Sequence, residues 1–235
     1  MQRKVIIIIG PPGSGKGIQA QLLSEKLNLF YLETSRIIEQ KFKEAKESEY
    51  VEVDGEKFYI SKEKELFEKG ILCSPPFVTY LIKEKIKELF EEDKNLVMAG
   101  SPRTLYEGKA VIPLLKEFYG RENIKVILIN LSDEESIFRN SHRRLCSLMR
   151  HPILYNKETK NLTRCPLDGS KLIVRVLDNV EVMKVRIKEY KERTLPLIDY
   201  FRREDLEIKE VKGKQTPAEL HEDILRTLEI SNDFD

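Results

Sequence analysis

The stretch that decides the fold lies near the start of the chain, at residues 5–17, VIIIIGPPGSGKG. Its five consecutive β-branched residues predict a buried strand, and the sequence after the glycine-rich turn has helical periodicity. Glycines let the backbone curl so that consecutive N–H groups point at one anion, and the next helix adds its positive end. Lys16 supplies a mobile charge for β- and γ-phosphates. The stretch therefore predicts a P-loop, and the alternative is a βα turn that binds nothing.

Outward from this stretch, short β-branched runs alternate with helical periods, as in doubly wound α/β proteins with a mostly parallel sheet. Five strands are predicted, at residues 4–9, 29–32, 96–99, 125–130 and 207–212. Helical patterns cover about residues 16–26, 35–46, 75–91, 105–118, 134–144, 179–203 and 217–230. Two stretches differ. Residues 50–60, with Asp54-Gly55 between alternating apolar positions, predict a β-hairpin, and residues 146–174 predict a small loop-rich lobe.

Composition narrows the class of protein. The 235 residues carry 41 Lys plus Arg against 40 Asp plus Glu, so a net charge of +1 argues against a global nucleic-acid footprint. The longest aliphatic run near the start, Val5–Ile9, is too short for a signal peptide or a membrane span, which predicts a cytoplasmic protein without a membrane partner. Three cysteines are too few for a disulfide framework, so reduced thiols or metal ligands are expected.

The wording of the loop, GPPGSGKG, resembles that of adenylate kinase and its nucleoside monophosphate kinase relatives. Residues 96–104, LVMAGSPRT, are similar to that family's strand followed by DGFPRT, and residues 132–144, SDEESIFRNSHRR, are similar to its approach to the lid. The resemblance covers about residues 4–229. It implies a three-layer P-loop kinase with a mostly parallel five-stranded sheet, an acceptor-binding lobe and a small lid. The core would comprise residues 1–32, 74–142 and 175–235, the acceptor lobe with its inserted hairpin residues 33–73, and the lid residues 143–174.

The resemblance also implies roles for individual residues. ATP would be held by the loop and by two arginines near the lid: Gly10, Pro12, Gly13, Ser14, Gly15, Lys16, Gly17, Ile18, Arg139 and Arg143. AMP would be held by Thr34, Arg36, Gly100, Arg103, Glu107, Arg175 and Arg186. The catalytic cations would be Lys16, Arg103, Arg139, Arg143, Arg175 and Arg186. Arginines suit this chemistry because phosphoryl transfer depends on positioning and on neutralising the oxygens of the moving group.

Several positions depart from the family pattern. Ile18 lacks the hydroxyl of the family's threonine, and Ala99 replaces the aspartate that orients the hydration shell of Mg²⁺. We expect activity with weakened metal binding, in which another carboxylate assists or the phosphates hold the ion; Asp178 is a distant candidate. Glu39 replaces the acceptor-phosphate arginine, for which Arg36 could substitute, and Glu107 replaces a base-reading glutamine. An ordinary charged helix surface is the alternative for these last three residues and for Glu33.

The lid resembles the zinc-binding lids of bacterial family members, but Met149 stands where the second ligand would be. His151 is close by, and Cys146, His151, Cys165 and Asp168 would form an acceptable tetrahedral zinc set. A lid held by hydrogen bonds alone is the alternative. Cys73 is expected to be a packed side chain.

The sequence therefore predicts a monomeric nucleoside monophosphate kinase that uses Mg²⁺ with ATP and transfers the γ-phosphoryl group reversibly to AMP. Another acceptor, such as CMP, UMP or dAMP, stays open because of Glu39 and Glu107. A nucleotide sensor with little turnover is the third reading, favoured by Ile18 and Ala99 and opposed by the arginines.

Overall fold

A computed structural model describes residues 4–46, 48–68, 71–150, 152–174 and 179–230. Its centre is a five-stranded, fully parallel sheet in the order β10-β6-β1-β5-β2. These strands are β1 (Val5–Ile9), β2 (Phe30–Glu33), β5 (Leu96–Ala99), β6 (Ile124–Asn130) and β10 (Glu207–Lys212). The α/β fold predicted from the sequence is confirmed, with each predicted strand within one residue of its observed ends.

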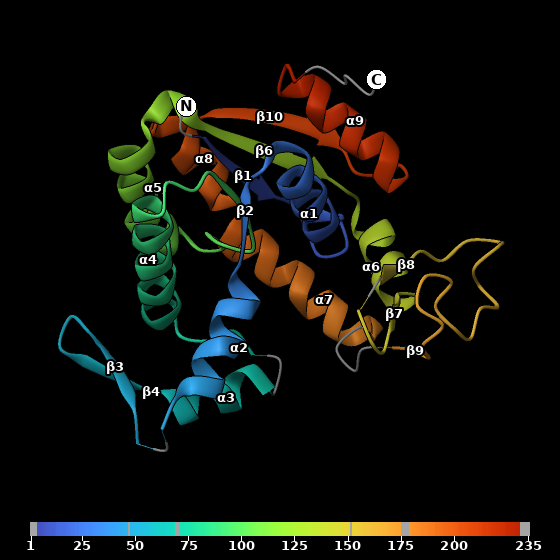
Figure 1. Ribbon diagram of the computed structural model, residues 1–235, viewed down its shortest axis with the longest axis horizontal. Coiled ribbons are helices and arrows are strands. Elements are labelled where there is room, and N and C mark those ends of the chain that lie inside the picture. The colour runs from blue at the N-terminus through green and yellow to red at the C-terminus, as the bar shows by residue number, and fades with distance from the viewer. Residues whose placement is uncertain (1–3, 47, 69–70, 151, 175–178, 231–235) are drawn as a thin grey trace.

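Helices cover both faces of this sheet (Figure 1). The side chains of Val5, Ile7 and Ile9 in β1 pack in an apolar cluster on one face of the sheet. Those of Ile6 and Ile8 pack in a second cluster on the other face. The run of β-branched residues is therefore buried on both sides, as parallel strands between helical layers require. The first cluster includes residues of α4 (Pro75–Glu91), α5 (Leu105–Tyr119) and α8 (Pro196–Arg203). The second includes residues of α1 (Lys16–Leu27) and α9 (Pro217–Thr227).

Two smaller lobes project from the core (Figure 1). The first contains α2 (Thr34–Glu44), the hairpin of β3 (Tyr50–Val53) and β4 (Glu56–Tyr59), and α3 (Ile60–Glu68). The second follows α6 (Asp133–Ser141) and is built on β7 (Arg144–Cys146), β8 (Pro152–Ile153) and β9 (Leu172–Ile173). The hairpin predicted around Asp54-Gly55 is confirmed, and Gly55 has the positive φ of 83° that its turn requires.

The sequence pattern differs from the structure at two helices. No helix was predicted over α3, which carries five charged residues in nine and packs through a few side chains, among them Phe67 against Phe42 at 5.5 Å between ring centroids. The single helix predicted over residues 179–203 is α7 (Val180–Glu189), a π-helical turn (Tyr190–Thr194) and α8. Pro196 begins α8, and a proline cannot donate the hydrogen bond that an uninterrupted α-helix needs there. A short 3₁₀ turn (Arg121–Asn123) leads into β6.

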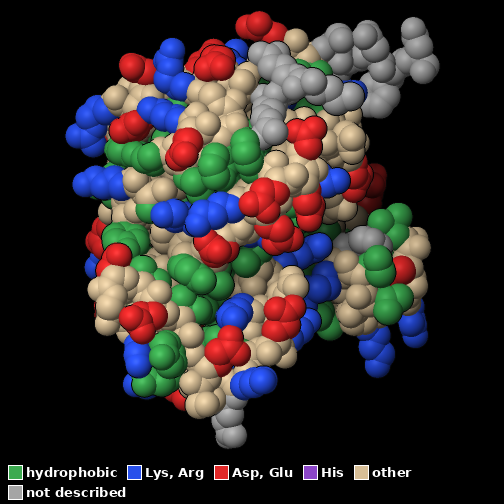
Figure 2. Space-filling model, turned by 60° about the vertical axis from the view of Figure 1, so that its left-hand side comes forward, with side chains coloured by type: hydrophobic (Ala, Val, Ile, Leu, Met, Phe, Trp, Pro, Cys, Tyr) green, Lys and Arg blue, Asp and Glu red, His purple; other side chains and the backbone are tan. Residues whose placement is uncertain are grey.

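Charged side chains of both signs are interspersed over the face seen in Figure 2. Many form ion pairs between elements, such as Lys116 of α5 with Glu204 after α8 at 2.5 Å and Lys125 of β6 with Glu207 of β10 at 2.5 Å. No helix in the described part of the chain has the length and apolar character needed to cross a bilayer.

Candidate active site

The P-loop connects the carboxyl end of β1 to the start of α1. Gly13 and Gly15 have φ values of 76° and 92°, a backbone conformation that side chains disfavour, and Gly15 caps α1. Gly10 lies so close to β6 that an added Cβ would be 2.8 Å from the carbonyl oxygen of Ile129. The positive φ therefore favours glycine at positions 13 and 15, and the close approach of β6 favours glycine at position 10.

Lys16 folds back beneath this loop. Its Nζ donates to the carbonyl oxygens of Gly10 (2.7 Å) and Pro11 (2.8 Å). Burial first, and then the positive charges of Arg103 and Arg186, together lower the pKa of the Lys16 ammonium to about 7. Three predicted catalytic cations thus act on one another, and an anion between them would relieve both the burial and the repulsion.

Ser14 and Thr34 offer polar atoms without partners. Both are buried, and among the described residues neither hydroxyl has a hydrogen-bond partner. Ser14 belongs to the P-loop, and Thr34 begins α2 at the end of β2. Buried hydroxyls normally find a partner, so these two fit a site completed by phosphate or by water around it.

Gly100, Thr34 and Arg103 meet beyond the end of β5. A Cβ added at Gly100 would lie 3.2 Å from Nη2 of Arg103 and 3.4 Å from Oγ1 of Thr34, and φ of Gly100 is 113°. The backbone carbonyl of Arg103 also accepts a hydrogen bond from Thr194 Oγ1 at 2.8 Å, in the π-helical turn. The structure therefore brings three of the predicted acceptor-site residues together.

Glu107 is buried against its own loop. Its carboxylate accepts hydrogen bonds from Ser101 Oγ (2.9 Å), the backbone N–H of Arg103 (3.0 Å) and Thr104 Oγ1 (3.3 Å). Thr104 in turn caps α5 by accepting from the N–H of Glu107 at 3.2 Å. Burial raises the pKa of the Glu107 carboxyl, and these donors oppose the rise. Its predicted contact with an acceptor base stays a prediction, and the contacts present hold the Arg103 loop.

Arg36 lies at the exposed edge of the acceptor lobe. Its Nε is 2.7 Å from Glu33 Oε2, and 79% of its side chain is exposed. Ser35 Oγ donates to the other carboxylate oxygen of Glu33 at 2.9 Å. Among the described contacts Arg36 is paired with one carboxylate, and its exposed guanidinium is accessible to an arriving anion.

Helix α6 contacts the P-loop through two residues that the sequence analysis did not single out, Ser136 and Asn140. Ser136 Oγ donates to the carbonyl oxygen of Pro12 at 2.5 Å, and Asn140 Nδ2 donates to that of Ser136 at 2.8 Å. A Cβ added at Gly13 would lie 2.2 Å from Asn140 Nδ2. Both residues are buried. Their spacing of four, with polar side chains on the inner side of an amphipathic helix, is the signal in the sequence.

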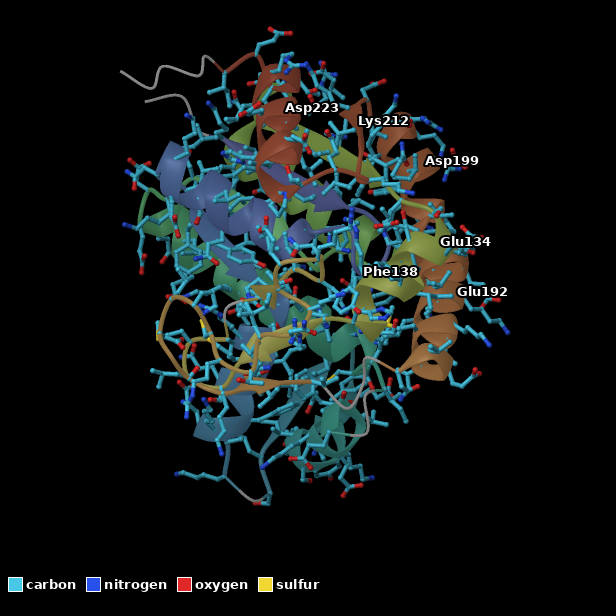
Figure 3. All side chains as sticks on the ribbon, turned by 90° about the vertical axis from the view of Figure 1, so that its right-hand side faces the viewer. Glu134, Phe138, Glu192, Asp199, Lys212 and Asp223 are labelled. Carbon is cyan, nitrogen blue, oxygen red and sulfur yellow. The ribbon has the colours of Figure 1, made fainter. Side chains whose placement is uncertain are left out.

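The same helix carries Arg139, whose Nε lies 2.8 Å from Glu135 Oε1 and whose Nη2 donates to the carbonyl oxygen of Gln215 at 3.4 Å. Figure 3 labels Glu134 and Phe138 about one turn apart along α6. The ring of Phe138 lies 6.0 Å from that of Tyr155 in the lid. Helix α6 thus touches both the P-loop and the lid.

The remaining predicted cations are distributed between α6 and α7. Arg143 lies two residues beyond α6 and directly before β7, where the lid begins. Arg186 lies on α7, with Nη1 3.7 Å from Met183 Sδ, and is close enough to lower the pKa of Lys16. Arg175, Asp178 and His151 lie outside the described residues.

The lid contains a compact group of metal-ligating atoms. One ligand atom each from Cys146, Cys165 and Asp168 lies within 4.8 Å of the others, and both cysteines are buried. Cys146 Sγ donates to Asp168 Oδ2 at 3.0 Å. Hydrogen bonds from Cys146 and Ser170 hold the pKa of Asp168 well below its usual range, whereas burial raises the pKa of the Cys165 thiol.

Three of the four predicted zinc ligands are therefore clustered, and the fourth, His151, is not described. Met149 is 64% exposed and has a thioether that zinc binds poorly. The apolar cluster of the lid is small, built on Cys146, Ile153 and Cys165 with Leu162 and Leu172 beside it. A lobe of this size gains stability from a metal that joins its turns.

Comparison with known proteins agrees with this arrangement. A family model described as "Adenylate kinase" matches residues 8–206. An adenylate kinase of Petrotoga mobilis is 28% identical over 228 residues, which cover 97% of this chain and 98% of the relative. One from Methanothrix thermoacetophila is 30% identical over 226 residues, covering 95% and 97%, and one from Chlamydia trachomatis serovar D is 30% identical over 209 residues, covering 83% and 78%.

Proposed function

Because the chain belongs to the adenylate kinase family and is a phosphotransferase with nucleoside monophosphate kinase activity, we propose that its acceptor is AMP and its donor ATP. The γ-phosphoryl group passes reversibly to an oxygen of the AMP phosphate, and two ADP molecules result. The observation that carries the proposal is that Arg103 and Arg186 lie near enough to Lys16 for their charges to lower its pKa.

These residues act by binding and charge neutralisation. Lys16 exchanges the carbonyls of Gly10 and Pro11 for oxygens of the donor phosphates, and Arg103 holds the acceptor phosphate beside Gly100 and Thr34. In the transition state, negative charge spreads over the oxygens of the transferring group. Each positive charge stabilises this transition state more than it stabilises the ground state. Positioning two nucleotides in line supplies much of the rest of the acceleration.

The other arginines complete the proposal. Arg139 stacks on the donor base, Arg143 and Arg175 approach the transferring group as the lid of residues 143–174 closes, and Arg36 binds the acceptor phosphate from the lobe of residues 33–73. Closure excludes water, which would otherwise compete with AMP for the phosphoryl group. The proposal takes the protein as the monomeric, cytoplasmic enzyme expected from its sequence, and light scattering and cell fractionation test these two points.

Adenylate kinases use Mg²⁺ with ATP. The unpartnered hydroxyl of Ser14 in the P-loop fits a site shared by phosphate and hydrated Mg²⁺, although Ile18 and Ala99 contribute no ligand atom. When bound, Mg²⁺ neutralises and orients the β- and γ-phosphates. The P-loop residues would then hold the phosphates to which the ion is bound.

A panel of monophosphates tests the acceptor. Purified protein with ATP and Mg²⁺ is assayed against AMP, dAMP, CMP and UMP, and the highest kcat/KM is expected with AMP. A higher value with a pyrimidine acceptor would reassign the base. The second candidate, a nucleotide sensor, is favoured by Ala99 and Ile18, and nucleotide binding without turnover on any of the four would support it.

We also propose one structural Zn²⁺ in the lid, held by Cys146, Cys165, Asp168 and His151. Elemental analysis of purified protein should find about one zinc per chain, and Cys165→Ser should lose it. Cys73→Ser is the matched control, because Cys73 is a buried thiol in the other lobe, 3.6 Å from the carbonyl oxygen of Glu63. A metal-free preparation with the same lid melting as the zinc-loaded protein would assign the order of the lid to hydrogen bonds.

A further inference from the structure

The sheet places a carboxylate directly beside the position at which the sequence lacks one. Strands β2 and β5 are parallel neighbours, and Glu33 is in register with Ala99 at their carboxyl ends. Two residues earlier, Tyr31 is in register with Val97. Residues two apart on a strand share a face, and residues in register on adjacent strands share it too.

That face is the one that carries the P-loop helix. Val97 and Ala99 are buried in the apolar cluster that includes Ala20 of α1, and Tyr31 packs against the same cluster. Glu33 therefore lies at the end of β2 on the α1 side of the sheet. This is the side on which an aspartate at position 99 would also lie.

Tyr31 links Glu33 to the start of α1. A Cβ added at Gly17 would lie 3.4 Å from the Tyr31 hydroxyl oxygen, so this ring reaches the residue directly after Lys16. Burial first, and then the charge of Glu33, raise the pKa of Tyr31 to about 12 against the opposing charges of Arg36 and Arg103. The carboxylate is thus near enough to act on a hydroxyl that touches the P-loop helix.

Glu33 is partly exposed and lies next to a second polar side chain. The next residue is Thr34, whose buried hydroxyl has no hydrogen-bond partner in the described part of the chain. The side chain of Glu33 is 29% exposed, and the described partners of its carboxylate are Ser35 and Arg36 on α2. Arg36 is mostly exposed, so water screens its pair with Glu33 and the carboxylate can accept from other donors as well.

From this register and these contacts we infer that Glu33 supplies the carboxylate that position 99 lacks, by accepting hydrogen bonds from water molecules bound to the Mg²⁺ of the nucleotide. The inference rests on the proposed kinase function and names a positioning residue for it. Glu33 acts through water and orients the hydrated ion, whose ligand waters are better held by a charged acceptor than by an amide. The carboxylate that orients the hydrated ion would then come from β2 instead of β5, which offsets the weakened metal binding expected from Ala99.

The test measures nucleotide binding rather than turnover. Calorimetry gives the Kd of a non-hydrolysable ATP analogue, the β,γ-imido compound, with Mg²⁺ and with EDTA, and the ratio of the two values is the enhancement by magnesium. Glu33→Gln keeps the size of the side chain and removes its charge. We expect it to lower the enhancement about tenfold, with the Kd in EDTA changed less than twofold.

Two further variants make the result specific. Adding Ala99→Asp to Glu33→Gln returns a carboxylate to the neighbouring strand and should restore the enhancement. Glu44→Gln is the matched control, since Glu44 is an exposed carboxylate of α2 paired only with Gln40 among the contacts described, at 2.8 Å, and should behave as wild type.

Three outcomes would overturn the inference. They are an unchanged enhancement in Glu33→Gln, equal weakening with and without Mg²⁺, and a loss that Ala99→Asp does not restore, which would assign the effect to the pair with Arg36. A wild-type ratio of one would overturn it as well. The assay needs no acceptor, so a failure of phosphoryl transfer with all four monophosphates would reject the proposed function separately.

Discussion

The donor and acceptor ends of the candidate site are built from different materials. The donor end is built mainly from backbone atoms. The carbonyl oxygens of Gly10 and Pro11 accept hydrogen bonds from Lys16, and that of Pro12 accepts one from Ser136. At the acceptor end, side chains meet one another, as in the pair of Arg36 with Glu33. The P-loop of the donor end keeps the sequence pattern of the family, whereas the acceptor end departs from that pattern at Glu39 and Glu107.

The difference has a physical reason. A loop whose glycines adopt positive φ and contact β6 or α6 tolerates few substitutions, because each added Cβ meets an atom within about 3 Å or a strained backbone. A charged side chain at a strand end has no such constraint, and an equivalent charge can come from the next turn or the adjacent strand. A charge supplied by a side chain can therefore come from a different position in the sequence, whereas the glycines of the P-loop cannot be exchanged in this way.

The largest expected effect is at the donor end. Lys16→Met should lower kcat/KM about 10³-fold, because it removes the charge nearest to the transferring phosphates. The fold should survive, as shown by circular dichroism and an unchanged thermal transition. Lys87→Met, on the exposed side of α4, is the control and should keep full activity. Turnover of Lys16→Met within tenfold of wild type would remove Lys16 from the site.

Arg103→Ala should follow, with a loss of about 10² in kcat/KM and weaker acceptor binding. The reason is that Arg103 is the cation beside Gly100 and Thr34 and also acts on Lys16. Steady-state kinetics with varied AMP measures both effects. Arg202→Ala, an exposed arginine of α8 paired with Asp199, should change neither. An unchanged KM for AMP in Arg103→Ala would contradict the acceptor role.

The pH dependence of donor binding tests the charge of Lys16. Its pKa in the free protein is about 7, lowered from 10.5, and bound phosphates favour the protonated form. Binding at pH 8 should therefore take up about one proton, and affinity should fall about tenfold per pH unit above 7 and level off below it.

Calorimetry in buffers with different ionisation enthalpies counts the protons taken up. Lys16→Met should abolish the uptake, because methionine does not titrate. Donor affinity that is constant from pH 7 to pH 9 would contradict the lowered pKa.

The smallest expected effect is at the contact between α6 and the P-loop. Asn140→Ala should raise the KM for ATP about threefold to tenfold and leave that for AMP unchanged, because Asn140 and Ser136 support only the donor loop. Loss of a buried hydrogen bond should also cost about 1–2 kcal/mol of unfolding free energy. Ser141→Ala on the same helix is the control, because the described partners of its hydroxyl are Ile137, Phe138 and the adjacent His142 rather than the P-loop. Equal increases in both KM values would show a general loss of structure.

The sequence pattern predicted the core well for a clear reason. Strands buried on both faces and a P-loop with its glycines are local signals, and each lies in one continuous stretch. Helix α3 was missed because its burial comes from a few contacts with distant residues. The break of residues 179–203 into two helices and a π-helical turn follows from Pro196 and from packing of Tyr190–Thr194 near the Arg103 loop.

By itself, the sequence determined the P-loop and the strands of the core, since these follow from local periodicity and fixed spacing, and its resemblance to a kinase family indicated the candidate cations. Only the tertiary structure decided which side chains meet. It turned the carboxylate of Glu107 onto its own loop, brought Asn140 against Gly13 from far along the chain, and placed Glu33 beside Ala99 through strand register. Register and helix packing join residues whose separation in sequence carries no signal, so these contacts exist only in the folded chain.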